Sequence, residues 1–226
     1  MKKFLTNTLI LWSILVINNV QASNKIYKYE TIIETLQKPW SMAFLPNGNM
    51  LITELAGNIR ELKANSILSP PLTGVPKAFV KGQGGLSDIV LHPDFIDNKL
   101  VYISYAVTTD KGSTLRVVKG TLEEGSLSNV VNVFTAHADR RAAAHYGARL
   151  LFLKDKTLLI SSGDGANHRE EAQNLRTHFG KIIRINDDGP FRMTTPLLTN
   201  QRLYQKYGLM VIETHRAWSL LRVVSL

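Results

Sequence analysis

The stretch WSMAFLPNGNMLITEL, Trp40–Leu55, decides the fold that this sequence predicts. Its two ends are apolar and rich in strand-forming residues, and Pro46–Asn49 between them is a turn sequence. Asparagine and glycine tolerate the positive φ angles of the tight turns that join antiparallel strands. We therefore expect a β-hairpin at Trp40–Leu55.

The same pattern of apolar strand, polar turn and apolar strand occurs twice more. One copy begins at Leu86 (LSDIVLHPDFIDNKLVYISY) and another at Ala148 (ARLLFLKDKTLLISSGD). The first and last copies align without a gap, which places Phe44 over Phe152. Repeats about 50 residues apart, with weak helical periodicity, are typical of β-propeller blades. A β-sandwich is the alternative, but near-repetition of one unit favours the propeller.

Residues 23–189 hold about three of these units. The predicted fold is therefore all-β, a partial β-propeller of about three blades. A closed propeller needs at least about four blades. We expect an incomplete ring, which leaves two sheet faces without the neighbours on which such repeats stack.

The N-terminal residues 1–22, MKKFLTNTLILWSILVINNVQA, predict a secretory signal peptide that is cleaved after Ala22. They contain two lysines and then an apolar run that is shorter than the roughly 20 residues of a membrane span. We therefore expect no stable membrane insertion after cleavage. The chain has no cysteine, which excludes disulfides and thiolate metal sites. Together these features indicate a periplasmic or secreted protein.

The net charge of +9 does not indicate a nucleic-acid-binding protein. The leader accounts for +2 of this charge and residues 190–226 for +4, which leaves +3 for residues 23–189. No basic stripe with interleaved aromatic residues is visible in the sequence. We therefore expect no nucleic acid among the partners of this chain.

The motif KGQGGLSDIVLHPDF, Lys81–Phe95, combines a glycine-rich turn with a polar amide at Gln83. The glycines let the backbone approach a ligand closely, and the amide can donate a hydrogen bond to a substrate or cofactor oxygen. Taken alone, the motif is explained better by an ordinary loop between blades. His92, which precedes Pro93, is expected to be structural and to fix the exit of the strand.

The motif HYGARLLF places His145 at the start of a predicted strand, where its side chain can project into the mouth of a propeller. A neutral imidazole is a competent general base near neutral pH. Taken alone, a single histidine at a strand start is more often structural. Both interpretations stay open on these residues alone.

The segment Ser161–Ile185 contains four close metal-ligating side chains, those of Asp164, His168, Glu170 and Glu171. A metal-dependent hydrolase that uses Asp164, His168 and Glu171 is conceivable. No metal-ligand spacing such as His-Glu-x-x-His occurs, so a solvated loop is favoured and no metal ligand is assigned.

Five motifs together resemble one known family. KPWSMAFLPNGNMLITE, LTGVP, GQGGLSDIVLHPDF, HYGARLLF and AQNLRTHFGKIIRINDDG occur in the order and spacing of the soluble aldose sugar dehydrogenases, the glucose/sorbosone dehydrogenase family. The resemblance covers roughly residues 35–189. Family members are exported six-bladed propellers that use pyrroloquinoline quinone (PQQ) with calcium. The resemblance implies an oxidoreductase that oxidises the anomeric carbon of aldoses to lactones by hydride transfer to PQQ.

The resemblance also implies roles for two residues. His145 matches the catalytic base that takes the proton from the anomeric hydroxyl, and Gln83 matches a glutamine beside the substrate and the quinone. Ala144 stands where the family usually has Asn or Asp, and Ala148 stands where it has its second glycine. Loss of a hydrogen-bonding neighbour at Ala144 puts the orientation of the substrate in doubt. The electron acceptor is not implied.

The likeness ends after Asp188, and a frameshift is our hypothesis for residues 190–226. Codons chosen within the degeneracy of the genetic code for Tyr207–Trp218, read one base earlier, give Ile-Trp-Ser-Tyr-Gly-His-Arg-Asn-Pro-Gln-Gly-Leu, the family's next motif. We therefore expect an out-of-frame, poorly ordered tail. The calcium ligands and most of the PQQ contacts of the family lie beyond this point.

Two functions remain from the sequence. One is a PQQ-dependent aldose sugar dehydrogenase by descent, which this chain would retain in impaired or inactive form because the C-terminal half of the family is missing. The alternative is a non-catalytic, exported β-propeller fragment. Binding of the quinone and turnover of aldoses distinguish them.

Overall fold

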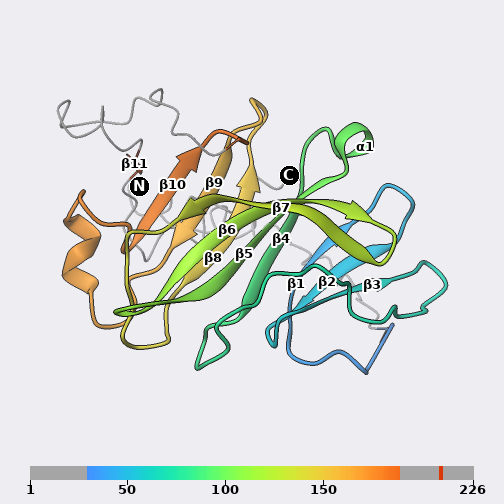
Figure 1. Cartoon of the computed structure of the whole chain (residues 1–226), viewed down its shortest axis with the longest axis horizontal. Coiled ribbons are helices and arrows are strands. Elements are labelled where there is room, and N and C mark those ends of the chain that lie inside the picture. The colour runs from blue at the N-terminus through green and yellow to red at the C-terminus, as the bar shows by residue number, and fades with distance from the viewer. Residues whose placement is uncertain (1–29, 189–208, 211–226) are drawn as a thin grey trace, which may run out of the picture. The chain divides into compact units, whose positions relative to one another are not determined.

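The computed structural model describes residues 30–188 and 209–210 of the 226-residue chain. The chain divides into a unit of residues Met1–Ile32 and a unit of residues Ile33–Leu226. All the elements given below belong to the second unit, whose described residues form three antiparallel sheets (Figure 1).

The first sheet is the predicted hairpin extended by one strand. It consists of β1 (Pro39–Phe44), β2 (Met50–Glu54) and β3 (Asn58–Leu62). Gly48 in the connecting turn has a φ of 85°, and the backbone N–H of Leu45 donates to the carbonyl of Asn49. The two strands are therefore joined by the tight turn that these asparagines and this glycine predict.

The second sheet is built from longer strands. It consists of β4 (Leu86–Leu91), β5 (Leu100–Thr109), β6 (Gly112–Glu123) and β7 (Ser126–Thr135), in that spatial order. The short helix α1 (Phe95–Asn98) joins β4 to β5.

The third sheet has the order β8, β9, β10 and β11. These strands are Gly147–Phe152, Leu158–Ser162, Lys181–Ile185 and Leu209–Met210, and the 3₁₀ helix η1 (Arg169–Gln173) lies between β9 and β10. Phe44 pairs with Met50 in the first sheet and Phe152 pairs with Leu158 in the third, so the two hairpins share one register. This confirms the gapless alignment of the two copies.

The first strands of the three sheets are neighbours in space, because β1 packs beside β4 and β4 packs beside β8. Sheets that meet along their first strands and extend outward in chain order are arranged as propeller blades. One hydrophobic cluster, which includes Leu51 and Ile103, joins the first sheet to the second. Another, which includes Val117 and Ile160, joins the second sheet to the third. The predicted all-β partial propeller of about three blades is confirmed.

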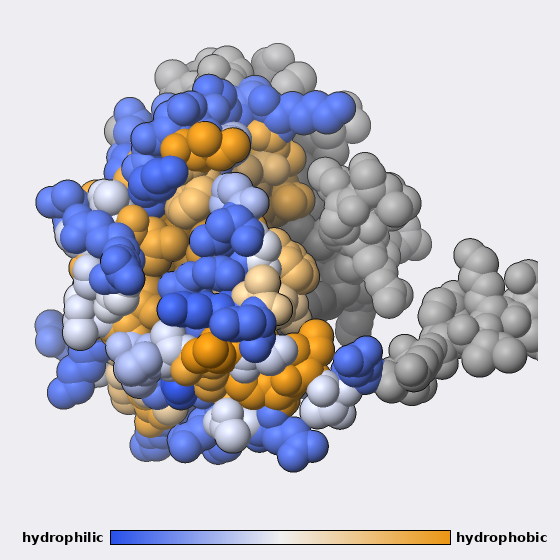
Figure 2. Space-filling view, turned by 90° about the vertical axis from the view of Figure 1, so that its right-hand side faces the viewer, coloured by the Kyte–Doolittle hydropathy of each residue, from blue (hydrophilic) through white to orange (hydrophobic). Residues whose placement is uncertain are grey.

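The outward face of the first sheet is partly apolar and exposed. Met42 and Phe44 lie two residues apart on β1, so they share a face, and they are 59% and 67% exposed. Figure 2 looks at the side on which β1–β3 lie in Figure 1, and hydrophobic residues are visible there among hydrophilic ones. Met42 and Phe44 on β1 therefore lack the covering that the second sheet gives the other face, whereas Ile52 on the same face is buried.

His92 has the structural role expected of it. Its ring is buried, Nδ1 accepts the backbone N–H of Asp94 at 3.0 Å, and Nε2 lies 3.3 Å from a carboxylate oxygen of Asp187. Asp187 lies just after β10, so this histidine connects the end of β4 to the end of β10.

Two predicted segments lie mostly outside the described residues. The signal peptide at 1–22 is wholly outside them, and of the predicted tail at 190–226 only Leu209–Met210 is described, paired with Ile182 and Ile183 of β10. Within the described residues, no helix has the length and apolar character needed to span a bilayer.

Candidate active site

The register of the β8–β9 hairpin brings His145 and Asp164 together. Gly147 at the start of β8 pairs with Ser162 at the end of β9. His145 lies two residues before Gly147, and Asp164 lies two residues after Ser162. Because the strands are antiparallel, both side chains meet at the same end of the hairpin, and Nδ1 of His145 lies 2.8 Å from Oδ1 of Asp164.

The backbone around this pair is closely packed. A Cβ atom at Gly163 would lie 2.1 Å from the carbonyl oxygen of His145, so only glycine fits at that position. His145 itself has a φ of 49°, in the left-handed region that costs a residue other than glycine about 1–3 kcal/mol. Strain of this kind concentrates at functional sites, where the surrounding structure holds it.

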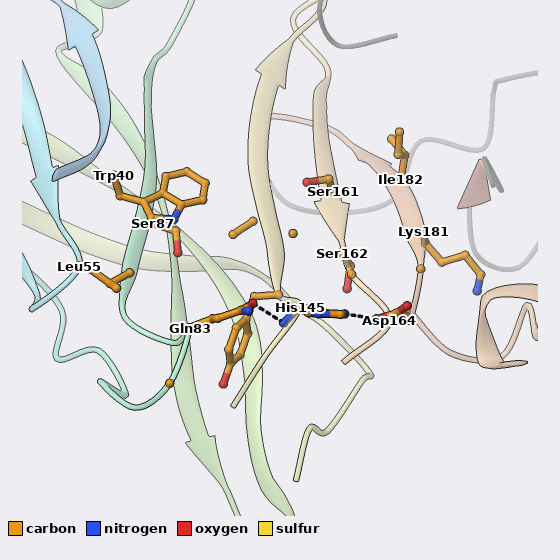
Figure 3. Close-up of a pocket in the computed structure, with 16 residues that line it drawn as sticks. Trp40, Leu55, Gln83, Ser87, His145, Ser161, Ser162, Asp164, Lys181 and Ile182 are labelled. Carbon is orange, nitrogen blue, oxygen red and sulfur yellow. Dashed lines mark hydrogen bonds and ion pairs between the residues drawn. The ribbon is translucent and has the colours of Figure 1, made fainter. Parts of the chain in front are cut away.

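Gln83 reaches the same place from the loop that precedes β4. Gly82 has a φ of 57°, and a Cβ atom there would lie 2.5 Å from the carbonyl oxygen of Ala143. This close approach lets the side-chain oxygen of Gln83 accept the backbone N–H of His145 at 2.8 Å. With its oxygen engaged, the amide of Gln83 keeps its two N–H donors for a ligand. Figure 3 shows Gln83 on one side of His145 and Asp164 on the other.

These three side chains line a cavity of about 590 Å³ (Figure 3). Trp40 of the first sheet, Leu55 directly after β2 and Ala148 of the third sheet contribute apolar surface to it. A concave, mostly apolar space with a few convergent polar groups is the usual form of a small-molecule site. The cavity is thus large enough for a small organic ligand, and Gln83, His145 and Asp164 converge on one part of it.

The electrostatics of the pair fix the proton on the histidine ring. Partial burial raises the pKa of Asp164, but hydrogen bonds from the backbone of Ala166 and from His145, together with the charge of Arg169, outweigh it and lower the pKa below its usual value. Asp164 is therefore a carboxylate at neutral pH and accepts a hydrogen bond from the protonated Nδ1 of His145. In the neutral ring this leaves the lone pair on Nε2, which has no hydrogen-bond partner among the described residues.

The acidic loop after β9 does not gather its ligating side chains at one point. Asp164 pairs with His145, His168 stacks on Phe179 with ring centroids 4.4 Å apart, and a carboxylate oxygen of Glu171 accepts the side-chain amide of Asn174. Within residues 30–188 and 209–210, no three His, Cys, Asp or Glu side chains are grouped to hold a metal ion. The hydrolase alternative has no site in this part of the chain.

The sequence singled out Gln83 and His145 as candidates, but not Asp164 as the partner of His145. The structure brings all three together, whereas His168, Glu170 and Glu171 do not contact the pair in the described hydrogen bonds. Pairing Gly147 with Ser162 across the hairpin predicts that the residues two positions outside this pair are neighbours. The hairpin is visible in the sequence, but the register shift between Gly147 and Leu150 that produces this pairing is not.

Ala148, which stands in place of a family glycine, has a φ of 67° and is fully buried. A Cβ in the left-handed region is strained, while the same methyl group gains from burial. The two effects are each about 1 kcal/mol and oppose each other, which accounts for the tolerance of alanine at this position.

Comparison with known proteins gives a family match over most of the chain. The family model for glucose/sorbosone dehydrogenases matches residues 36–207. The aldose sugar dehydrogenase YliI of Escherichia coli is 36% identical over 173 residues, which are 75% of this chain and 46% of that protein.

Solved structures give the same result. The soluble aldose sugar dehydrogenase of Escherichia coli, in its apo form, has a TM-score of 0.71 and 36% identity over 74% of this chain and 49% of its own. The PQQ-bound aldose sugar dehydrogenase of Streptomyces coelicolor has a TM-score of 0.64 and 28% identity over 72% and 48%. The chain spans about half the length of these relatives. It belongs to the glucose/sorbosone dehydrogenase family.

Proposed function

We propose that this chain is related in function to the PQQ-dependent aldose sugar dehydrogenases and retains the site that accepts the proton of the sugar. In this proposal Nε2 of His145 takes the proton of the anomeric hydroxyl while the sugar is oxidised to its lactone. The observation that carries the proposal is the 2.8 Å contact between Nδ1 of His145 and Asp164, which leaves Nε2 as the free acceptor beside the cavity. A base fixed in one tautomer by a carboxylate needs no reorganisation before it accepts a proton.

The described residues fit one side of the quinone that the family implies. Gln83 offers amide N–H donors to a quinone or sugar oxygen, and Trp40 and Leu55 offer apolar surface to a flat ring system. PQQ, when bound, supplies the acceptor for the hydride that leaves the anomeric carbon. Calcium is implied only by the family resemblance, and the described residues hold no group of three His, Cys, Asp or Glu side chains that we can assign to it.

The substrate class follows from the relatives rather than from the cavity. The names of the Escherichia coli and Streptomyces coelicolor proteins specify aldose sugars, and we extend that class to this chain as part of the proposal. The cavity does not choose among aldoses, and the electron acceptor is not identified.

Reconstitution tests this proposal directly. The full chain, loaded with PQQ and calcium, is assayed for reduction of an artificial dye with glucose and other aldoses. Turnover that disappears in His145→Ala supports the enzyme. Absence of quinone binding by fluorescence titration would instead support the alternative, a non-catalytic propeller fragment.

The proposed impairment rests on the frameshift hypothesis for residues 190–226. The family match continues through residues 189–207, which overlap the predicted tail, so the nucleotide sequence around codon 189 is the decisive observation. We expect the alternative frame to continue into further blades. If it contains stop codons instead, the frameshift hypothesis is wrong.

We also propose that the chain is exported through cleavage of residues 1–22. The apolar run of the leader and the absence of cysteine support this proposal. Expression in a bacterium should yield a periplasmic protein whose N-terminal residue, determined by sequencing, is Ser23. An intact Met1 in the recovered protein contradicts it.

A further inference from the structure

Arg140 is the largest fully buried side chain among the described residues, and its role is not explained by the fold alone. No carboxylate lies within ion-pair distance of its guanidinium in the described part of the chain. Burial lowers the pKa of Arg140 to about 10, so the side chain still carries its charge at neutral pH. A buried charge without an ionic partner is costly and needs compensating contacts.

The compensating contacts lead to Asp164. One terminal nitrogen of Arg140 donates to the carbonyl of Ala138 at 2.7 Å. The other donates to the hydroxyl of Ser162 at 2.9 Å and to the carbonyl of Gly163 at 3.0 Å. Ser162 and Gly163 are the two residues directly before Asp164, so the guanidinium holds the backbone from which this carboxylate projects.

A second set of contacts leads to His145. The guanidinium carbon of Arg140 lies 5.1 Å from the ring centroid of Tyr146 and 5.3 Å from that of Phe179. Tyr146 directly follows His145, and its hydroxyl shares a hydrogen bond with the hydroxyl of Ser113. The guanidinium of Arg140 therefore contacts the chain neighbours of both members of the pair. It lies over the ring of Tyr146, next to His145, and donates a hydrogen bond to Gly163, next to Asp164.

We propose that Arg140 is a positioning residue that holds His145 and Asp164 in hydrogen-bonding contact by clamping Tyr146 and Gly163 around one guanidinium. It touches neither the cavity nor the reacting atoms, so it acts through the pair. A lysine does not replace it, because a single ammonium nitrogen cannot donate from the two positions that the terminal nitrogens of Arg140 occupy while also contacting both rings. The effect on turnover rests on the proposed function, whereas the effect on the His145 tautomer does not.

The test measures the tautomer of His145 in the full chain by ¹H–¹⁵N NMR of the histidine side chains. The His145 signals are assigned by their loss in His145→Gln. In the unsubstituted chain we expect the proton on Nδ1. In Arg140→Met and Arg140→Lys we expect a shift toward the Nε2-protonated form that predominates in free imidazole side chains. Arg141→Met, at the exposed neighbouring arginine, is the matched control and should leave the tautomer unchanged.

A folding defect in Arg140→Met is separated from a positioning effect by Ser162→Ala. This variant keeps the guanidinium and removes one of its hydrogen bonds beside Asp164. We expect it to retain the circular dichroism of the folded chain and to shift the tautomer in the same direction. Folded variants at both positions with an unchanged His145 tautomer overturn the proposal.

Turnover adds an independent readout. In a preparation that oxidises aldoses, Arg140→Lys should lower kcat about 10- to 100-fold. KM should change little, because the substitution moves the base His145 and leaves the groups that bind the substrate in place. A preparation without turnover counts against the proposed function, and the NMR result then still decides the role of Arg140. Turnover that persists beside an unchanged tautomer counts against Arg140 alone.

Discussion

At the scale of single residues, the site depends on where the chain places one carboxylate. A histidine at a strand start has no defined tautomer by itself. Asp164 supplies that definition because it lies across the hairpin, 2.8 Å from Nδ1 of His145, and its pKa is lowered by the hydrogen bonds it accepts. The chemistry proposed for His145 is therefore a property of the pair.

Substitution of Asp164 by asparagine tests this dependence. An asparagine that offers its N–H₂ to Nδ1 of His145 favours the tautomer with the proton on Nε2, which cannot accept one from the sugar. We expect kcat in the reconstituted chain to fall on the order of 10²- to 10⁴-fold with little change in KM. Asp97→Asn, at an exposed carboxylate, is the control. An unchanged kcat in Asp164→Asn would show that His145 works without its partner.

His178 makes a prediction about stability and pH. Its ring is buried, and Nδ1 accepts the backbone N–H of His137 at 2.7 Å, which the unprotonated nitrogen alone can do. Burial first, and then the positive charges of His137, Lys181 and Arg140, lower its pKa from 6.5 to about 4. Between these pH values the unfolded chain binds a proton that the folded chain does not. The contribution of His178 to the free energy of unfolding is therefore fully present above pH 6.5 and is lost as the pH falls toward 4.

Urea unfolding between pH 7 and pH 4 measures this effect. His178 should contribute a loss of about 2–3 kcal/mol over that range, and His178→Gln, which stays neutral, should flatten the profile by that amount. His168→Gln is the control, because His168 stacks on Phe179 instead. Parallel profiles for the unsubstituted chain and His178→Gln would show that His178 does not resist protonation in the fold.

At the scale of elements, the part of the fold that the sequence predicted is mainly the pairing of strands within hairpins. The repeat of Trp40–Leu55 at Ala148 fixed two of the three sheets in their correct pairing, because turn residues and strand alternation are local signals. Arg140 gave no such signal. Its partners at Ser162 and Phe179 are distant in sequence, and an arginine between an aspartate and a second arginine has the composition of an exposed loop.

Asp88 links elements rather than residues of one sheet. Its carboxylate accepts the hydroxyl of Ser41 on β1 and the backbone N–H of Leu150 on β8 at 2.8 Å, and it lies 3.4 Å from the guanidinium of Arg149. Burial raises the pKa of Asp88, and these hydrogen bonds act against that rise. Because Asp88 lies on β4, one side chain joins the first strands of all three sheets.

Asp88→Asn should destabilise the chain by about 1–3 kcal/mol. The donors from Ser41, Leu150 and Ile89 all point at this carboxylate, so the N–H₂ group of an asparagine must face at least one of them. Urea unfolding at pH 7 measures the change. An exposed substitution such as Asp97→Asn should stay within about 0.5 kcal/mol. Equal stability of the two variants would show that the three strands are held by apolar packing alone.

At the scale of the whole molecule, the first sheet has two unlike faces. Leu51 on one face is fully buried in the cluster shared with the second sheet. Met42 and Phe44 on the other face are mostly exposed. Exposed apolar groups on a sheet face promote association between molecules and contribute little to the stability of one molecule.

The double variant Met42→Thr/Phe44→Thr separates these two effects. Threonine keeps a strand-forming side chain and removes apolar surface, so we expect less self-association by sedimentation velocity and a free energy of unfolding within about 0.5 kcal/mol of the unsubstituted chain. Leu51→Ala, on the buried face, should cost about 2–5 kcal/mol in the same urea titration. A loss above about 2 kcal/mol in the double variant would contradict exposure of this face, since only side chains packed in the folded monomer cost that much to remove. A face that is exposed in the monomer and prone to association should therefore show its effect in the sedimentation profile and not in the unfolding curve.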